Sequence, residues 1–245
     1  HHETGVAEFA TMAMLMLPRR VCHYDQRLRR GDWRGSVMWG EPPELETLVG
    51  KRVLIVGIGH IGKEIAVRVK AFGAHVVGVT RDASREIIAA DRLVEFSRWR
   101  GELPHADYVI ASVRLTAETE GLFGSAEFAA MQRSAYFINV SRATVAQEAA
   151  LYEALLKNTI AGAAIDVWYR HPQRRDEVCL PSNQPFHELT NVLMSPTRSS
   201  WTRDMLAGRT RDVAENIRRL QQRRELINRG KGTERHTSLG GSHGQ

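Results

Sequence analysis

The chain has 245 residues, of which 42% are hydrophobic and 25% are charged. This composition is typical of a globular protein and excludes a coiled coil or a chain disordered throughout. Lysine and arginine number 34 against 28 for aspartate and glutamate, so the net charge is +6 and anionic partners are favoured.

Several classes of protein are excluded by short-range features. The apolar run 13–17 ends at Pro18, far below the ~18 residues of a membrane helix, and it follows acidic residues, unlike a signal peptide. Cys22 and Cys179 lie outside any CxxC motif, so neither a metal site nor a disulfide framework is predicted. We therefore expect a cytoplasmic protein without a membrane partner.

The positive charge is concentrated near the carboxyl terminus, in eight arginines between Arg198 and Arg224. Acidic residues such as Asp204 and Glu215 are interspersed among them. This mixture is typical of a solvated helix face rather than of a basic stripe that binds nucleic acid. Nucleic acid is therefore not the expected partner.

A helical pattern opens the chain. Apolar residues at helical spacing predict one amphipathic helix over residues 4–30, ended by Gly31. A linker rich in glycine and proline follows over residues 35–50. The apolar residues of the predicted helix are Val6, Phe9, Ala13, Leu17, Val21 and Leu28.

Strand-like and helical segments then alternate. This alternation predicts an α/β fold with a doubly wound parallel sheet and helices on both faces. The aliphatic run 52–56 is typical of a strand buried on both faces. The further predicted strands are 75–79, 108–112, 135–140, 163–167 and 192–194. The predicted helices are 61–72, 125–131, 147–156 and 202–224, and residues 228–245 are predicted to be a disordered tail.

The sequence G-I-G-H-I-G at residues 57–62 lies between a predicted strand and a predicted helix, where it indicates a dinucleotide-binding loop. Gly57 permits the tight turn, Gly59 lets the backbone approach a pyrophosphate, and Gly62 lets helix and strand pack closely. The helix start, with His60 and Ile61, offers free N–H groups to the phosphates. The His60 side chain either reaches the phosphates or is simply exposed.

The end of the second strand predicts the cofactor preference. An NAD site carries an acidic residue about 20 residues beyond the glycines, but here Thr80 and Arg81 occupy that place. With Ser84 and Arg85 nearby, these hydroxyl and guanidinium groups suit a 2′-phosphate. We therefore predict that NADP is preferred. NAD remains the alternative if Arg81 is only a solvated loop residue.

Taken together, these motifs resemble the D-isomer-specific 2-hydroxyacid dehydrogenase family from about Val6 to Asn228. Several motifs in the family's order are more specific than any one of them. Besides the glycine loop, the matching segments are V-A-E at 6–8, L-T-A-E-T at 115–119, N-V-S-R-A at 139–143, G-A-A-I-D-V at 162–167 and N-V-L-M-S-P-T at 191–197.

The resemblance implies a Rossmann domain with flanking interdomain helices, and a homodimer formed through the cofactor domains and the first helix. It divides the chain into an interdomain and dimerisation helix (1–35), a dinucleotide-binding domain (36–196) and a returning helix of the substrate domain (197–227), before the tail (228–245). The family's N-terminal substrate-domain segment is expected to be absent from the chain.

The resemblance also implies hydride transfer between a nicotinamide cofactor and a small 2-hydroxy or 2-oxo acid. Arg142 matches the family's cation for the substrate carboxylate. Thr197 stands where the family has its catalytic histidine; a threonine hydroxyl holds a water or a substrate hydroxyl but is no base near neutral pH. His171 stands where the family has its orienting glutamate. It is either a relocated base or a solvated loop histidine.

Four further cofactor contacts follow from the resemblance. Val113, Thr116 and Ser141 lie at strand ends that face the cofactor in the family, and Asp166 either contacts the nicotinamide carboxamide or caps a loop.

Two functions remain open. One is an NAD(P)-dependent oxidoreductase acting on the CH–OH group of 2-hydroxy acids, favoured by Arg142 and Asp166. The alternative, favoured by Thr197, is a non-catalytic dinucleotide-binding or sensing protein of the same fold.

Overall fold

The computed structural model describes residues 1–39, 45–84 and 86–227. The chain divides into two compact units. The larger unit is His2–Thr202, and the smaller contains His1 and the chain from Arg203 onward. The domain boundaries drawn from the family resemblance, at residues 35 and 196, remain predictions.

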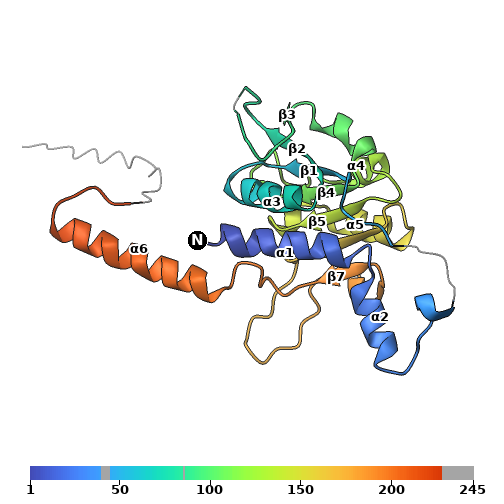
Figure 1. The fold of residues 1–245 in the computed structure, drawn as a ribbon. Coiled ribbons are helices and arrows are strands. Elements are labelled where there is room, and N and C mark those ends of the chain that lie inside the picture. Colours follow the sequence, from blue (N-terminus) through green and yellow to red (C-terminus); the bar gives the residue numbers. More distant parts are fainter. Residues whose placement is uncertain (40–44, 85, 228–245) are drawn as a thin grey trace, which may run out of the picture. The chain divides into compact units, whose positions relative to one another are not determined.

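The larger unit is built on a parallel sheet that has seven strands among the described residues (Figure 1). The strand order is β3-β2-β1-β4-β5-β6-β7, so the direction of winding reverses between β1 and β4. This order confirms the predicted doubly wound fold, in which ligands bind where the winding reverses. The strands are β1 (Arg52–Val56), β2 (His75–Thr80), β3 (Arg92–Glu95), β4 (Tyr108–Ala111), β5 (Tyr136–Asn139), β6 (Gly162–Ile165) and β7 (Val192–Met194).

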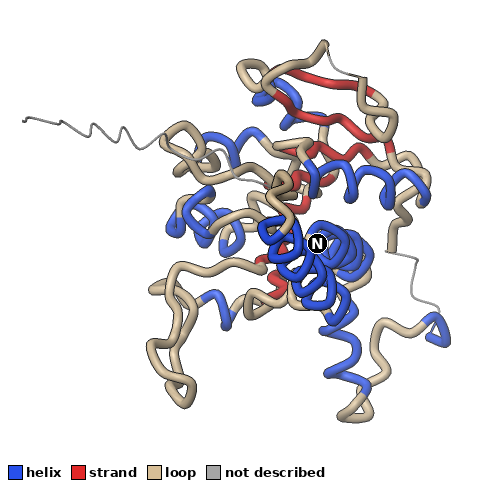
Figure 2. Tube along the Cα trace, turned by 90° about the vertical axis from the view of Figure 1, so that its left-hand side faces the viewer, coloured by secondary structure: helices blue, strands red, loops and turns tan. Residues whose placement is uncertain are grey.

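Helices lie on both sides of the strands (Figure 2). They are α1 (Glu3–Met16), α2 (Val21–Leu28), α3 (His60–Ala71), α4 (Ser125–Ala130) and α5 (Glu148–Leu156), with α6 (Arg203–Gln221) in the smaller unit. Short 3-10 turns are η1 (Val37–Trp39), η2 (Trp99–His105), η3 (Ala143–Val145) and η4 (Phe186–Glu188). None of the described helices is both long and apolar enough to cross a membrane.

Alternate residues of β1 enter two separate cores. Val53 and Ile55 pack with residues of α1 and α3, whereas Leu54 and Val56 pack with residues of α4 and α5. Burying each such aliphatic side chain contributes roughly 1.5–3 kcal/mol. The continuous aliphatic run therefore holds β1 rigidly in the centre of the sheet, with the glycine loop at its end.

The predicted helix over residues 4–30 is wrong in its extent, because the structure has two helices there. α1 ends at Met16, Arg20 adopts a left-handed backbone with φ 47°, and α2 begins at Val21. The break follows from Pro18, which has no N–H and whose ring conflicts with the carbonyl one turn earlier.

The apolar stripe of this segment is largely buried in its first part. Val6 and Ala13 are 3% and 0% exposed, because α1 packs against α3 and the sheet. The most exposed members of the stripe lie in its second part, where Val21 and Leu28 are 41% and 50% exposed.

Other elements lie close to their predicted bounds, with one omission. β3 was not predicted, because it has four residues at the edge of the sheet, charged at both ends, and only Val94 is buried. The predicted tail and the central part of the predicted linker, with Pro42 and Pro43, lie outside the described residues. The predicted solvated face of the last helix matches α6, where Glu215 pairs with Arg218 and Arg219.

Candidate functional site

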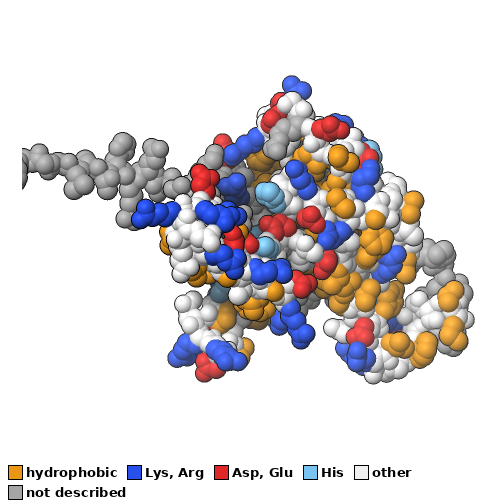
Figure 3. Space-filling model, turned by 60° about the vertical axis from the view of Figure 1, so that its left-hand side comes forward, with side chains coloured by type: hydrophobic (Ala, Val, Ile, Leu, Met, Phe, Trp, Pro, Cys, Tyr) orange, Lys and Arg blue, Asp and Glu red, His pale blue; other side chains and the backbone are white. Residues whose placement is uncertain are grey.

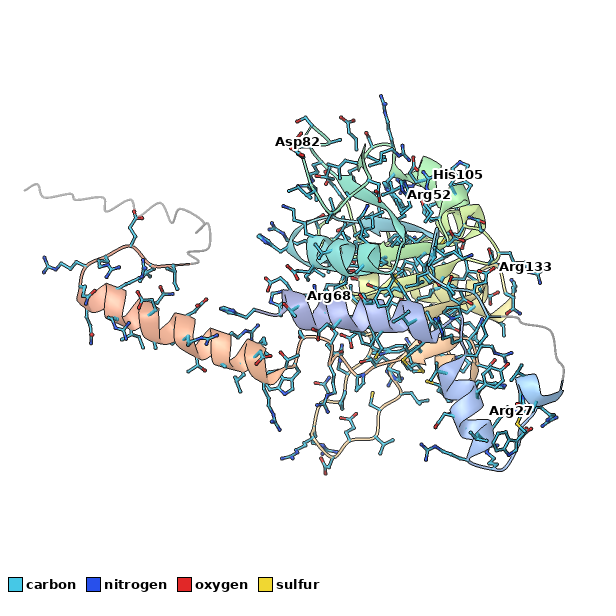
Figure 4. The ribbon with its side chains drawn as sticks, in the orientation of Figure 1. Arg27, Arg52, Arg68, Asp82, His105 and Arg133 are labelled. Atoms are coloured by element: carbon cyan, nitrogen blue, oxygen red, sulfur yellow. The ribbon has the colours of Figure 1, made fainter. Side chains whose placement is uncertain are left out.

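A cleft of about 700 Å³ opens at the carboxyl edge of the sheet, beside the ends of β1, β2 and β4. Figure 4 locates this edge: Asp82, after β2, lies on the left, whereas Arg52, His105 and Arg133 lie toward the amino ends of strands on the right. Eight of the residues predicted to bind a cofactor line the cleft: Gly57, Gly59, His60, Ile61, Thr80, Arg81, Val113 and Thr116.

Two of the three glycines of the loop have a steric reason to be glycine. Gly57 has φ +99°, and a Cβ there would lie 2.9 Å from the Ser112 carbonyl. At Gly62 a Cβ would lie 2.6 Å from the Gly57 carbonyl oxygen. At Gly59 a Cβ would meet nothing within 4 Å, so the backbone here faces open space. The geometry at Gly57 and Gly62 is that of the expected turn and packing roles.

The loop leads directly into α3, with Gly59 as the N-cap. The first N–H groups of a helix have no partner within the helix and carry its positive dipole end, which suits an anion. Neighbouring strands hold the loop in place: the Ser112 hydroxyl donates to the Gly57 carbonyl at 2.9 Å, and Ile58 N–H donates to the Val79 carbonyl at 2.9 Å. The loop and the start of α3 are therefore held in place by the neighbouring strands.

The tip of β2 carries a cation that already has a partner. The exposed Arg81 donates through Nη2 to Oε2 of Glu118 at 2.8 Å. Glu118 lies between β4 and α4, so sequence reasoning could not place it beside Arg81. The Ser84 hydroxyl donates to Asp82, and Arg85 lies outside the described residues.

The loop after β4 is organised around Thr119, which sequence reasoning also missed. Thr119 is 5% exposed. Its hydroxyl donates to the Arg114 carbonyl at 2.6 Å and accepts the Thr116 N–H at 2.8 Å. These bonds fix the backbone of Thr116, which lines the cleft, and the backbone of Glu118, which precedes Thr119. Arg114 also lines the cleft.

The turn after β5 places Ser141 and Arg142 differently. Ser141 is 5% exposed, and its hydroxyl donates to Oδ1 of Asn139 at 2.8 Å. Arg142 is exposed and donates through Nη1 to the Ser141 carbonyl at 2.7 Å. Neither residue lines the 700 Å³ cleft. Their proposed contacts to cofactor and substrate remain predictions.

Asp166, at the end of β6, binds the segment that follows β7. It is 3% exposed, and its carboxylate accepts the Ser195 hydroxyl at 2.6 Å and the N–H groups of Arg198 and Ser199 at 3.0 and 3.2 Å. The Trp168 indole N–H donates to the Ser195 carbonyl at 2.8 Å. These are the contacts of a loop cap, one of the two roles expected for Asp166. A contact to a carboxamide remains a prediction.

The loop that Asp166 holds presents Thr197 in an unusual conformation. Thr197 is exposed and has φ 57°, a left-handed backbone that a β-branched residue rarely adopts. His171 is exposed on the connection between β6 and η4. Among the described residues, no hydrogen bond joins Arg142, His171 and Thr197 to one another. The three proposed catalytic residues are therefore not assembled into a contact network.

The charged surface of this part of the molecule is mixed in sign. Figure 3 shows basic and acidic side chains interspersed over the face that comes forward, with histidines among them. No group of three or more His, Cys, Asp and Glu residues in the described ranges is arranged to hold a metal ion.

The comparisons with known proteins agree with one another. Residues 11–198 match the family profile described as "D-isomer specific 2-hydroxyacid dehydrogenase, NAD binding domain". The glyoxylate reductase of Korarchaeum cryptofilum is 32% identical over 212 residues, which are 86% of this chain and 61% of that protein. The D-3-phosphoglycerate dehydrogenase of Methanocaldococcus jannaschii is 31% identical over 217 residues, 88% of this chain and 39% of that protein. The chain thus spans less than two thirds of these relatives.

Solved structures are similar over nearly the whole chain. A D-isomer specific 2-hydroxyacid dehydrogenase from Xanthobacter autotrophicus Py2, in complex with NADPH and MES, has a TM-score of 0.73 at 27% identity. The match covers 93% of this chain and 87% of that chain. A protein of Polaromonas sp. JS6 66 has a TM-score of 0.78 at 24% identity, over 92% of this chain and 67% of that chain, and shows the likeness in fold.

Proposed function

Since the chain belongs to the D-isomer-specific 2-hydroxyacid dehydrogenase family, we propose that it binds a nicotinamide dinucleotide in the cleft at the carboxyl edge of the sheet. It would thereby form the cofactor-binding part of an NAD(P)-dependent oxidoreductase that acts on the CH–OH group of small 2-hydroxy acids. The glyoxylate reductases among its relatives support this substrate class.

The observation that carries the proposal is the open space beside Gly59 at the start of α3. A pyrophosphate needs close backbone approach, free N–H groups and a positive dipole end, and these meet at that point. Gly57 and Gly62 make the approach possible, because any side chain at either position would collide with backbone atoms. The cleft of about 700 Å³ continues from there to Thr80 and Arg81.

We further propose that the cofactor is preferentially NADP. Thr80 and Arg81 offer a hydroxyl and a guanidinium at the tip of β2, where an NAD site would carry a carboxylate. Guanidinium groups pair with phosphates through strong, charge-assisted hydrogen bonds. The similar protein from Xanthobacter autotrophicus is in complex with NADPH, which supports this preference.

We propose catalytic roles for three residues of this chain. When bound, a nicotinamide cofactor supplies the hydride transfer. Arg142 would hold the substrate carboxylate: a guanidinium has five N–H donors, and one of them is directed at the Ser141 carbonyl. Thr197 would hold a water or the substrate hydroxyl. His171 is proposed as the proton-exchanging group only if the loop that carries it moves toward the cleft.

A second function, non-catalytic binding or sensing of the dinucleotide, is favoured by Thr197. Its hydroxyl cannot take a proton near neutral pH, and its strained backbone is held by the contacts of Asp166 with neighbouring residues. On this hypothesis the binding cleft is used without turnover.

The homodimer also remains a proposal. α1 is largely buried against its own unit, and the exposed apolar side chains of this segment are Met12 on α1 and Val21 and Leu28 on α2. Light scattering at micromolar concentration measures the mass directly. A monomer mass would contradict the proposal.

Substitution of Gly59 tests dinucleotide binding. Gly59→Ala places a methyl group in the proposed pyrophosphate space, where it contacts no protein atom. We expect NADPH and NADH affinity, measured by cofactor fluorescence, to fall at least about tenfold, whereas the free energy of unfolding changes by at most about 1 kcal/mol from the altered helix cap. Gly101→Ala is the matched control, because Gly101 in η2 also has open space at Cβ. Equal affinities in both variants would contradict the proposal.

A further inference from the structure

We propose that Glu118 is a specificity-determining residue of the cofactor cleft. Its carboxylate holds the Arg81 guanidinium and competes with the 2′-phosphate of NADP for it. Removal of this one negative charge would then increase the preference for NADPH over NADH. The inference rests on the proposed function, because it concerns how the same cleft distinguishes two dinucleotides.

The contact joins two loops that follow neighbouring parts of the sheet. Arg81 begins the connection from β2 to β3, and Glu118 lies in the connection from β4 to α4. Their atoms Nη2 and Oε2 are 2.8 Å apart, although 37 residues separate them in the sequence. Arg81 itself lines the cleft. Arg81, the cation that we assign to the 2′-phosphate, is therefore already paired with the Glu118 carboxylate when no cofactor is bound.

The backbone that carries Glu118 is fixed. The adjacent Thr119 is buried and bonded to Arg114 and Thr116, and the Thr116 carbonyl accepts the N–H groups of Thr119 and Glu120 at 3.0 and 2.9 Å. Glu118 thus lies within a tight turn that its neighbour anchors. Only its side chain, which is 66% exposed, is free to rotate away from Arg81.

The charges determine the direction of the effect. A phosphate monoester carries roughly −1.5 to −2 charges near neutral pH, so it is attracted to Arg81 and repelled by Glu118. The ribose 2′-hydroxyl of NAD carries no charge and can donate a hydrogen bond to a carboxylate, as it does to the acidic residue of NAD sites. Glu118 therefore supplies from another loop the carboxylate that the tip of β2 lacks.

The size of the effect is bounded by exposure. The side chains of Arg81 and Glu118 are 75% and 66% exposed, so water screens their attraction. An exposed pair of this kind changes an equilibrium by up to about fivefold. Glu118 is therefore expected to adjust the preference that Thr80 and Arg81 set, rather than to reverse it.

The test compares Glu118→Gln with Glu120→Gln in the full chain. Glu120 is an exposed glutamate two residues further along, so its variant makes the same change in net charge. Binding of NADPH, NADH and adenosine 2′,5′-bisphosphate is measured by fluorescence and calorimetry. We expect Glu118→Gln to bind NADPH and the bisphosphate about threefold to fivefold more tightly, with NADH affinity unchanged or lower. Glu120→Gln should leave the ratio of the two affinities unchanged.

A second background tests whether Glu118 acts through Arg81. In Arg81→Gln, the gain from Glu118→Gln on NADPH binding should shrink, because no guanidinium remains to be released. The inference is overturned if Glu118→Gln leaves the ratio of NADPH to NADH affinity unchanged, if Glu120→Gln has the same effect, or if the gain is undiminished without Arg81. Failure of the unmutated chain to bind either dinucleotide would instead contradict the proposed function itself.

Discussion

The carboxylate of Asp166 accepts a hydrogen bond from the hydroxyl of Ser195 at 2.6 Å, and this contact ties the end of β6 to the segment that leaves β7. The same carboxylate accepts the backbone N–H groups of Arg198 and Ser199. A buried anion that satisfies several donors holds them in one geometry. Asp166 therefore determines where Thr197 lies, although it does not contact Thr197 through any hydrogen bond given by the structure.

Asp166→Ala is expected to destabilise the fold by about 2–3 kcal/mol, because it leaves the N–H groups of Arg198 and Ser199 without their acceptor. Asp166→Asn keeps one acceptor oxygen and should cost less. Urea unfolding measures both. Equal stability of the alanine variant and the unmutated chain would show that the loop is not held by this carboxylate.

A substitution at Thr197 is expected to stabilise the fold. A left-handed conformation costs a residue with a Cβ roughly 1–2 kcal/mol, but asparagine tolerates it better than a β-branched residue does. Thr197→Asn is therefore expected to raise the free energy of unfolding by about 0.5–1 kcal/mol. Thr190→Asn is the control, since Thr190 is exposed and has no positive φ. A similar gain in both variants would exclude relief of strain as the cause.

The parts of the site that could be predicted are those with local causes. Gly57 and Gly62 are required by a turn and a close packing contact, and Gly59 lies between them at the start of α3. Pro18 also indicated a break after α1. The apolar periodicity continues across Pro18, so one continuous helix was predicted.

The contacts that could not be predicted join distant segments. Arg81 and Glu118 meet only because β2 and β4 are both neighbours of β1 in the sheet. β3 gave no strong signal, because an edge strand of four residues buries only Val94. Asp166 was identified as a site residue, but its role could not be predicted, because a loop cap and a carboxamide contact differ only in tertiary contacts.

Stability at low pH should depend on Asp91, which precedes β3. The Lys70 ammonium holds the pKa of Asp91 below its ordinary value, and the carboxylate also accepts the Val76 N–H at 2.7 Å. A lowered pKa in the folded state stabilises the fold above the unfolded pKa, and this contribution is lost as the pH falls through the folded pKa. Asp91→Asn should therefore reduce the loss of stability between pH 5 and about pH 2. Urea unfolding across this pH range measures the effect. An equal loss of stability in Asp91→Asn and in the unmutated protein would contradict the role of Asp91.

The cofactor preference depends on Arg81 in a directly measurable way. Arg81→Asp removes the phosphate-binding cation and places a carboxylate where NAD sites have one, opposite Glu118. Loss of a charge-assisted pair costs on the order of 1.5–3 kcal/mol, so NADPH affinity should fall at least about tenfold and NADH should become the tighter ligand. Titration calorimetry of both cofactors measures this. Equal affinity of the unmutated chain for NADPH and NADH would contradict the proposed preference.

Turnover separates the two proposed functions, and Thr197 is the residue at issue. We expect the chain to bind dinucleotide but to reduce glyoxylate or hydroxypyruvate poorly, because general acid–base catalysis contributes about 10²–10⁴-fold and Thr197 offers no base. Thr197→His should raise turnover if the missing imidazole is the main deficit. If His171 is a relocated base, the unmutated protein should already be active, and His171→Ala should abolish its turnover while leaving cofactor affinity intact. Robust reduction of either acid by the unmutated chain alone, unaffected by His171→Ala, would show that neither interpretation of these residues is correct.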